Sequence, residues 1–126
     1  MNVLLDTHAV LWWHEGDQRL GRAARRAIES ADTVWVSAAS GWEVAIKMAL
    51  GRLRVQATVA EIVRSNHFTE LRVALAHCER LALLELRHRD PFDRMLVAQA
   101  MVEGATLVTR DSALSGYGVP GVVVGR

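Results

Sequence analysis

Short apolar segments that alternate with helical patterns constrain the fold of this chain more than any other feature. Short, wholly apolar strands separated by helices are typical of a parallel sheet that is covered on both faces. The pattern therefore predicts an α/β protein, with a central, mainly parallel sheet between helical layers. Strands are expected at Asn2–Leu5, Thr33–Val36, Thr106–Thr109 and Val122–Val124, with a further short extended piece at Leu71–Val73.

The expected helices lie between these strands. Gly51 and Gly104 each follow a helical pattern and are suited to end it, because glycine readily adopts the left-handed conformation found after helices. Helices are expected at Thr7–Trp13, Leu20–Ser30, Ser37–Leu50, Thr58–Asn66, Cys78–Glu85 and Pro91–Glu103.

Composition narrows the class of protein further. The chain has 126 residues, 51% of them hydrophobic, and no repeat or linker divides it, so we expect a single domain spanning residues 1–126. A formal net charge of +1 gives no reason to assign a nucleic-acid partner from charge alone. The single cysteine, Cys78, excludes an internal disulfide and a cysteine-based zinc site. We expect Cys78 to pack on the apolar face of a helix.

The chain shows no signal for export or for membrane insertion. It contains neither a signal peptide nor an apolar run that approaches ~18 residues. We therefore expect a soluble, cytoplasmic protein without a membrane partner.

Four acidic residues stand where predicted strands or helices meet their loops, at Asp6, Glu43, Asp93 and Asp111. Because parallel strands joined by crossover helices share one carboxyl edge, we expect these four carboxylates to converge there. Carboxylates ~5.5 Å apart repel each other by roughly 3 kcal/mol at an effective dielectric of about 20. A cation or protons must offset that repulsion. Hard oxygen ligands of this kind suit Mg²⁺ or Mn²⁺.

Each acid also has a purely structural interpretation as a helix cap. Asp6 and Asp111 precede expected helices or turns, and Asp90 precedes Pro91, which favours the first position of a helix. Ser40 and Glu43 have the spacing of a capping box. Capping and metal binding are compatible, so both interpretations stay open for each acid. Capping alone does not require that the acids converge.

The same acids lie in four sequence segments that share a family pattern: Leu4-Leu5-Asp6-Thr7-His8, Ser37-Ala38-Ala39-Ser40-Gly41-Trp42-Glu43, His88-Arg89-Asp90-Pro91-Phe92-Asp93-Arg94-Met95-Leu96-Val97-Ala98 and Val108-Thr109-Arg110-Asp111. With these segments the chain resembles PIN-domain proteins of the VapC toxin family, from Met1 to about Val124. The resemblance implies a three-layer α/β/α fold and a Mg²⁺- or Mn²⁺-dependent endoribonuclease that leaves 5′-phosphate and 3′-hydroxyl ends. It also implies control by a cognate VapB-like antitoxin, and our hypothesis includes a homodimer.

Roles follow from the resemblance for residues that match its motifs. Asp6 and Asp93 are the expected direct metal ligands, while Glu43 and Asp111 bind through water or hold a second ion. Three further residues have supporting roles, with Thr7 and Thr109 orienting carboxylates and Asp90 acting mainly as a helix cap. The basic residues near the acids are candidates for RNA phosphate contacts and equally for ordinary surface charges: Arg94, Arg110 and Lys47.

Alternative functions were weighed against this hypothesis. A receiver-type phosphoacceptor domain is disfavoured, because no adjacent acidic pair follows the first strand. A phosphatase of the Asp-x-Asp type is disfavoured because His8 occupies the second acidic position. A PIN-like fold kept only as a non-catalytic binding module remains the main alternative.

The tryptophans and histidines are expected to be mostly structural. Trp35 and Trp42 are expected in the core, whereas Trp12 and Trp13 point in different directions, which leaves one of them for a protein interface. The histidines nearest the first acid, His8 and His14, are expected to be packing or surface residues.

Overall fold

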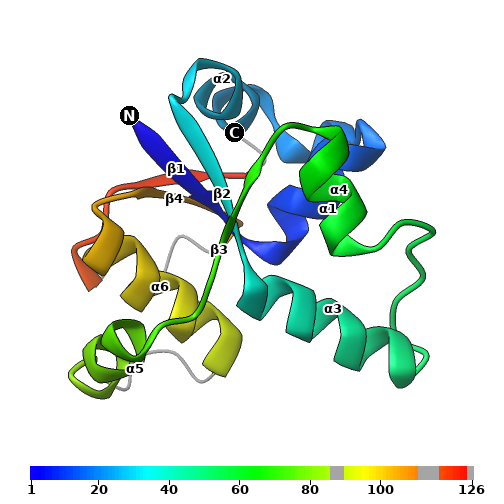
Figure 1. The fold of residues 1–126 in the computed structure, drawn as a ribbon. Helices are drawn as coiled ribbons and strands as arrows, with labels where there is room; N and C mark the ends of the chain where they lie inside the picture. The colour runs from blue at the N-terminus through cyan, green and yellow to red at the C-terminus, as the bar shows by residue number, and fades with distance from the viewer. Residues whose placement is uncertain (86–89, 111–116, 125–126) are drawn as a thin grey trace.

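A computed structural model of the chain describes residues 1–85, 90–110 and 117–124. Its strands form one sheet in the order β3-β2-β1-β4-β5, and every neighbouring pair is parallel (Figure 1). In the central register, Leu4 of β1 is aligned with Trp35 of β2 and with Leu107 of β4. The predicted parallel sheet is confirmed. The strands are β1 Asn2–Leu5, β2 Thr33–Ser37, β3 Thr69–Leu71, β4 Thr106–Thr109 and β5 Gly121–Val123.

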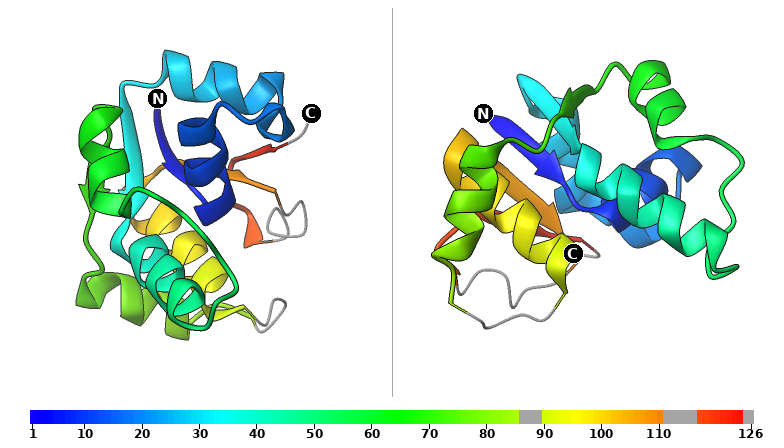
Figure 2. Two further views of the ribbon diagram at one scale, coloured as in Figure 1. Left: turned by 90° about the vertical axis from the view of Figure 1, so that its right-hand side faces the viewer. Right: turned by 60° about the horizontal axis from the view of Figure 1, so that its bottom comes forward.

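Helices connect the strands and cover both faces of the sheet. Figure 1 shows α1, α2 and α4 on one side of the strands and α5 and α6 on the other, and Figure 2 shows the same arrangement from two further directions. The helices are α1 Thr7–Glu15, α2 Arg22–Ser30, α3 Ala38–Ala49, α4 Val59–Ser65, α5 Leu75–Ala82 and α6 Pro91–Glu103, with a short 3₁₀ helix η1 at Gln18–Leu20.

Alternation along the strands divides the core into two layers. Val3 and Leu5 of β1 face a cluster formed with α1, α2 and α4, while Leu4 between them faces a cluster formed with α6. All three side chains are fully buried. Burying each contributes about 1.5–3 kcal/mol. Because both faces of β1 are covered, its three buried residues are all apolar although they face opposite sides. The predicted three-layer α/β/α fold is confirmed.

Two helix starts differ from the sequence predictions. The helix predicted from Leu20 begins at Arg22, because Leu20 belongs to η1 and Gly21 separates the two at φ 84°. The helix predicted from Cys78 begins three residues earlier, at Leu75. There the ring Nδ1 of His77 accepts a hydrogen bond from the backbone N–H of Ala74 at 2.9 Å and starts α5.

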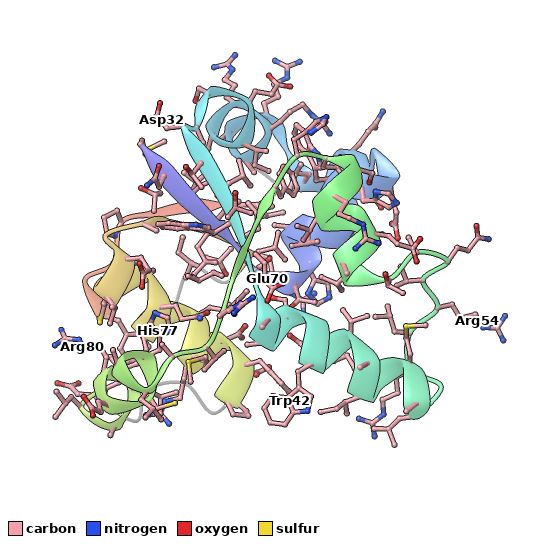
Figure 3. All side chains as sticks on the ribbon, viewed as in Figure 1. Asp32, Trp42, Arg54, Glu70, His77 and Arg80 are labelled. Atoms are coloured by element: carbon pink, nitrogen blue, oxygen red, sulfur yellow. The ribbon has the colours of Figure 1, made fainter. Side chains whose placement is uncertain are left out.

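Two predictions of burial are wrong. Cys78 is exposed, because α5 turns His77 rather than Cys78 towards α6. Trp42 is 65% exposed on the outer side of α3, where its ring meets Phe92 of α6 edge to face at 5.1 Å between centroids (Figure 3). Trp35 is half-buried and packs on the core cluster next to α6. Trp12 and Trp13 are both half-buried.

In the ranges that the structure describes, none of the helices has both the length and the apolarity that crossing a bilayer requires.

Candidate functional site

A polar pocket of 220 Å³ opens where β1 and β4 end and where α3 and α6 approach them. Three of the four predicted acids, Asp6, Glu43 and Asp93, line it, and so does the cap residue Asp90. The fourth, Asp111, lies outside the described residues. The lining residues are Asp6, Thr7, His8, Glu43, Lys47, Asp90, Asp93 and Arg110.

Asp6 is held by backbone donors from two parts of the chain. Its Oδ1 accepts from the N–H of Ala9 at 2.8 Å and caps α1, and its Oδ2 accepts from the N–H of Arg110 at 2.9 Å. The side chain is only 4% exposed. Asp6 therefore joins the end of β1 to the end of β4 with its carboxylate in a fixed orientation.

Glu43 is fixed by side chains instead. Its Oε1 accepts from the hydroxyl of Thr7 at 2.6 Å, and its Oε2 accepts from the ammonium of Lys47, also at 2.6 Å. Thr7 Oγ1 lies 3.1 Å from Ser40 Oγ. Since a hydroxyl carries one hydrogen, Thr7 donates to Glu43 and accepts from Ser40. The buried chain Ser40–Thr7–Glu43 thus links α3 to the start of α1.

The predicted capping box at Ser40 and Glu43 is wrong. Helix α3 is capped by Ser37, whose Oγ accepts from the N–H of Ala39 at 3.0 Å, so Ser40 and Glu43 lie inside the helix. Their spacing places them on one face of α3, and that face turns towards Thr7.

Asp90 and Asp93 enter the pocket from the start of α6. Asp90 caps this helix by accepting from the N–H groups of Phe92 at 2.9 Å and Asp93 at 3.3 Å, with Pro91 at the first helical position. The predicted cap is confirmed. Because Asp90 also lines the pocket, it contributes negative charge to the site in addition to capping the helix.

The other predicted site residues divide between the pocket and its surroundings. Lys47 and Arg110 line the pocket, whereas Arg94 is half-buried and its Nη2 donates to the carbonyl of Leu84 at 3.4 Å. Thr109 is buried at the end of β4. Arg94 and Thr109 are not among the lining residues.

His8 is a lining residue that the sequence interpretation passed over. The half-buried ring packs edge to face on Trp12 at 5.6 Å, and the guanidinium of Arg19 lies 4.7 Å from the centre of the Trp12 ring on the side of α1 leading to η1. Burial, and after it the nearby Arg110, lowers the pKa of His8, which favours a neutral imidazole. The sequence signal that could have identified His8 is its position in the first turn of α1, two residues after Asp6 at the end of β1.

The donor set fits a hydrated hard cation. Within residues 1–85, 90–110 and 117–124, no three His, Cys, Asp or Glu side chains are close enough to form a ready-made three-ligand site. Mg²⁺ keeps several waters and is commonly held by one or two carboxylates, so it does not need such a cage. Each carboxylate oxygen of Asp6 and Glu43 accepts one hydrogen bond from the described residues, which leaves further lone pairs for an ion or its waters.

Comparisons with known proteins decide the family. The model of the PIN domain family matches residues 3–119. The chain is 38% identical over 125 residues to Ribonuclease VapC22 of Mycobacterium tuberculosis, an alignment that covers 94% of this chain and 93% of that relative. The chain belongs to the PIN-domain proteins of the VapC family.

Solved structures of other proteins share the fold of this VapC-family chain. VapBC2 from Rickettsia felis, bound to a DNA fragment from its promoter, superposes with a TM-score of 0.68 at 12% identity and covers 98% of this chain and 99% of that chain. A toxin–antitoxin complex from Klebsiella pneumoniae superposes with a TM-score of 0.64 at 19% identity, and the match covers 96% of each chain. FitAcB from Neisseria gonorrhoeae also superposes with a TM-score of 0.64, at 16% identity, and the match covers 94% of this chain and 95% of that chain. At such identities the likeness shows the shared fold.

Proposed function

We propose that this VapC-family protein is a Mg²⁺-dependent endoribonuclease and the toxin of a VapBC-type pair. One observation carries the proposal: carboxylates from three elements meet in one pocket at the strand ends, in a chain 38% identical over nearly its whole length to a relative named as a ribonuclease. A PIN-like module that only binds its partner would not need these acids in one pocket.

Within that proposal, Asp6 and Asp93 would hold the ion directly, and Glu43 and Asp111 would bind it through water or hold a second ion. When bound, Mg²⁺ or Mn²⁺ would supply a more acidic water as nucleophile and would stabilise negative charge on the phosphoryl oxygens. The chain provides orientation. Backbone donors fix Asp6, and Thr7 fixes Glu43, so neither carboxylate has to reorganise when RNA binds.

Cationic and neutral donors in the pocket suit an RNA phosphate. Lys47 and Arg110 bring positive charge to the pocket, which favours binding of the phosphodiester backbone. The neutral imidazole of His8 adds a hydrogen-bond donor without adding charge. These contacts recognise the backbone and leave the choice of RNA to surfaces outside the pocket.

The partner in this proposal is a cognate VapB-like antitoxin, and the toxin is a cytoplasmic, single-domain homodimer. Support for the antitoxin partner comes from two solved structures of the same fold, one named as a toxin–antitoxin complex and the other as VapBC2. Expression should arrest growth, and coexpression of the neighbouring small reading frame should relieve the arrest. Arrest that persists with Asp6→Asn would rule out metal-dependent cleavage as its cause.

Cleavage of total RNA, including structured tRNA and ribosomal RNA, by purified protein freed of its partner tests the enzymatic proposal. We expect cleavage with Mg²⁺, none with EDTA, and a loss on the order of 10²-fold or more in Asp6→Asn and Asp93→Asn. Asn is a matched replacement at Asp6, because its side-chain oxygen can still cap α1. Undiminished cleavage in either variant would remove that residue from the proposed site. No cleavage of any RNA would favour the binding module.

A further inference from the structure

Two carboxylates of the pocket, Asp6 and Glu43, receive different kinds of donor. Asp6 accepts only neutral backbone N–H groups among the described residues, from Ala9 and Arg110. Glu43 accepts from the ammonium of Lys47 at 2.6 Å and from the hydroxyl of Thr7. One buried carboxylate therefore already has a cation, and the other does not.

The pair of Glu43 and Lys47 differs from an ordinary surface ion pair between residues one helical turn apart. The Glu43 side chain is only 7% exposed and that of Lys47 38%, so solvent screens the pair less than it would screen two exposed charges. Removing one partner of such a pair leaves a buried carboxylate without compensation, which is costly. Glu43 is therefore stabilised by the cation next to its Oε2, and loss of Lys47 would leave that place to a proton or a metal ion.

The residue type also matters. Lys47 is the only lysine among 15 Lys and Arg residues. An ammonium is a compact, strongly hydrated point charge, whereas a guanidinium is a planar fork. At this position the chain carries the side chain whose charge most nearly resembles a small inorganic cation.

We propose that the ammonium of Lys47 takes the place of a second metal ion at Glu43, so that the pocket binds one divalent ion, on the side of Asp6. This inference rests on the proposed metal-dependent function and specifies its stoichiometry. Glu43 then acts through its hydrogen bonds to Lys47 and Thr7 and binds no second ion. Lys47 is a positioning residue and does not have to touch the scissile phosphate.

Counting bound Mn²⁺ per chain by electron paramagnetic resonance and calorimetry, without RNA, tests the proposal. We expect one ion in the wild type and two in Lys47→Met, where Glu43 has lost its cation but keeps a side chain of similar length. Lys47→Arg restores the charge and should bind one ion. Arg54→Met, which removes one positive charge from the loop beyond α3 (Figure 3), is the matched control for net charge and should also bind one.

A double variant tests whether the added site in Lys47→Met depends on the carboxylate of Glu43. Glu43→Gln combined with Lys47→Met removes both charges, so the added site should disappear and the count should return to one. Two ions in the wild type, or one ion of unchanged affinity in Lys47→Met, would overturn the role of Lys47 while leaving metal dependence intact. A wild type that binds no ion would instead overturn the proposed metal dependence and this inference with it.

Discussion

Asp6 combines a structural and a chemical role through its two carboxylate oxygens. One oxygen caps α1 and the other accepts the N–H of Arg110, so a single buried side chain fixes the relation of β1, α1 and β4. The sequence left both the capping and the metal-binding interpretation of Asp6 open. The geometry allows both, because the two backbone donors do not use all the lone pairs of the carboxylate.

Thr7→Val tests the orientation of Glu43. Loss of the hydroxyl leaves Oε1 of Glu43 without its donor, so we expect RNA cleavage to fall about 10- to 100-fold, as for other residues that orient metal-site carboxylates. Thr7→Ser keeps the hydroxyl and should retain most of the activity. The test compares the cleavage rates of both variants and the wild type on one RNA. Equal rates for Thr7→Val and the wild type would contradict the proposed role of Thr7.

The local spacing of Ser40 and Glu43 led to the wrong prediction that Ser40 caps a helix. Ser40 and Glu43 fit a capping box, yet the same three-residue separation also places two side chains on one face inside a helix. The cap at Ser37 places both residues inside α3, and the partner that they share, Thr7, lies 33 residues earlier than Ser40. No local pattern contains the contact with Thr7.

At the scale of elements, helix starts that use common capping chemistry were predicted best. The Asp90-Pro91 start of α6 was predicted, because both residues have strong and local preferences. The start of α5 was missed, because its first turn is capped by the ring of His77. That ring in turn donates to Glu103 of α6 at 2.8 Å, which is a tertiary contact.

Asp90→Ala should lower the free energy of unfolding by about 1 kcal/mol, because α6 loses its N-cap. Asp90→Asn keeps an accepting oxygen and should stay within a few tenths of a kcal/mol of the wild type. Urea denaturation of the three proteins measures both differences. An equal loss in Asn and Ala would show that charge, rather than the cap, carries the effect.

Trp42→Ala tests whether the Trp42 side chain is exposed, as in the structure, or buried in the core, as the sequence predicted. A largely exposed ring that meets Phe92 edge to face should contribute about 1 kcal/mol, whereas a tryptophan in the core would contribute about 3–5 kcal/mol. The midpoint of denaturant unfolding distinguishes these values. A loss of about 3–5 kcal/mol in the free energy of unfolding would instead indicate that Trp42 is buried in the core.

At the scale of the whole molecule, the class of fold and the edge that carries the acids were predictable, while the details of the pocket were not. Alternation of apolar strands and helices predicts a parallel sheet, and a parallel sheet places every strand end on one edge. The order β3-β2-β1-β4-β5 depends on pairings between distant segments. The partners of Glu43 and the place of His8 depend on that order and on helix packing, so sequence patterns do not contain them.

We propose above all that the acids of this pocket would hold a divalent ion and that RNA cleavage depends on it. The most direct measurement is the chemistry of the new RNA ends, determined for the same RNA with Mg²⁺, with EDTA, and with EDTA followed by excess Mg²⁺. The account predicts 5′-phosphate and 3′-hydroxyl ends that vanish with EDTA and return with Mg²⁺, and that Asp6→Asn does not produce. Cleavage that persists in EDTA, or ends carrying a 2′,3′-cyclic phosphate from attack by the RNA's own hydroxyl, would contradict it.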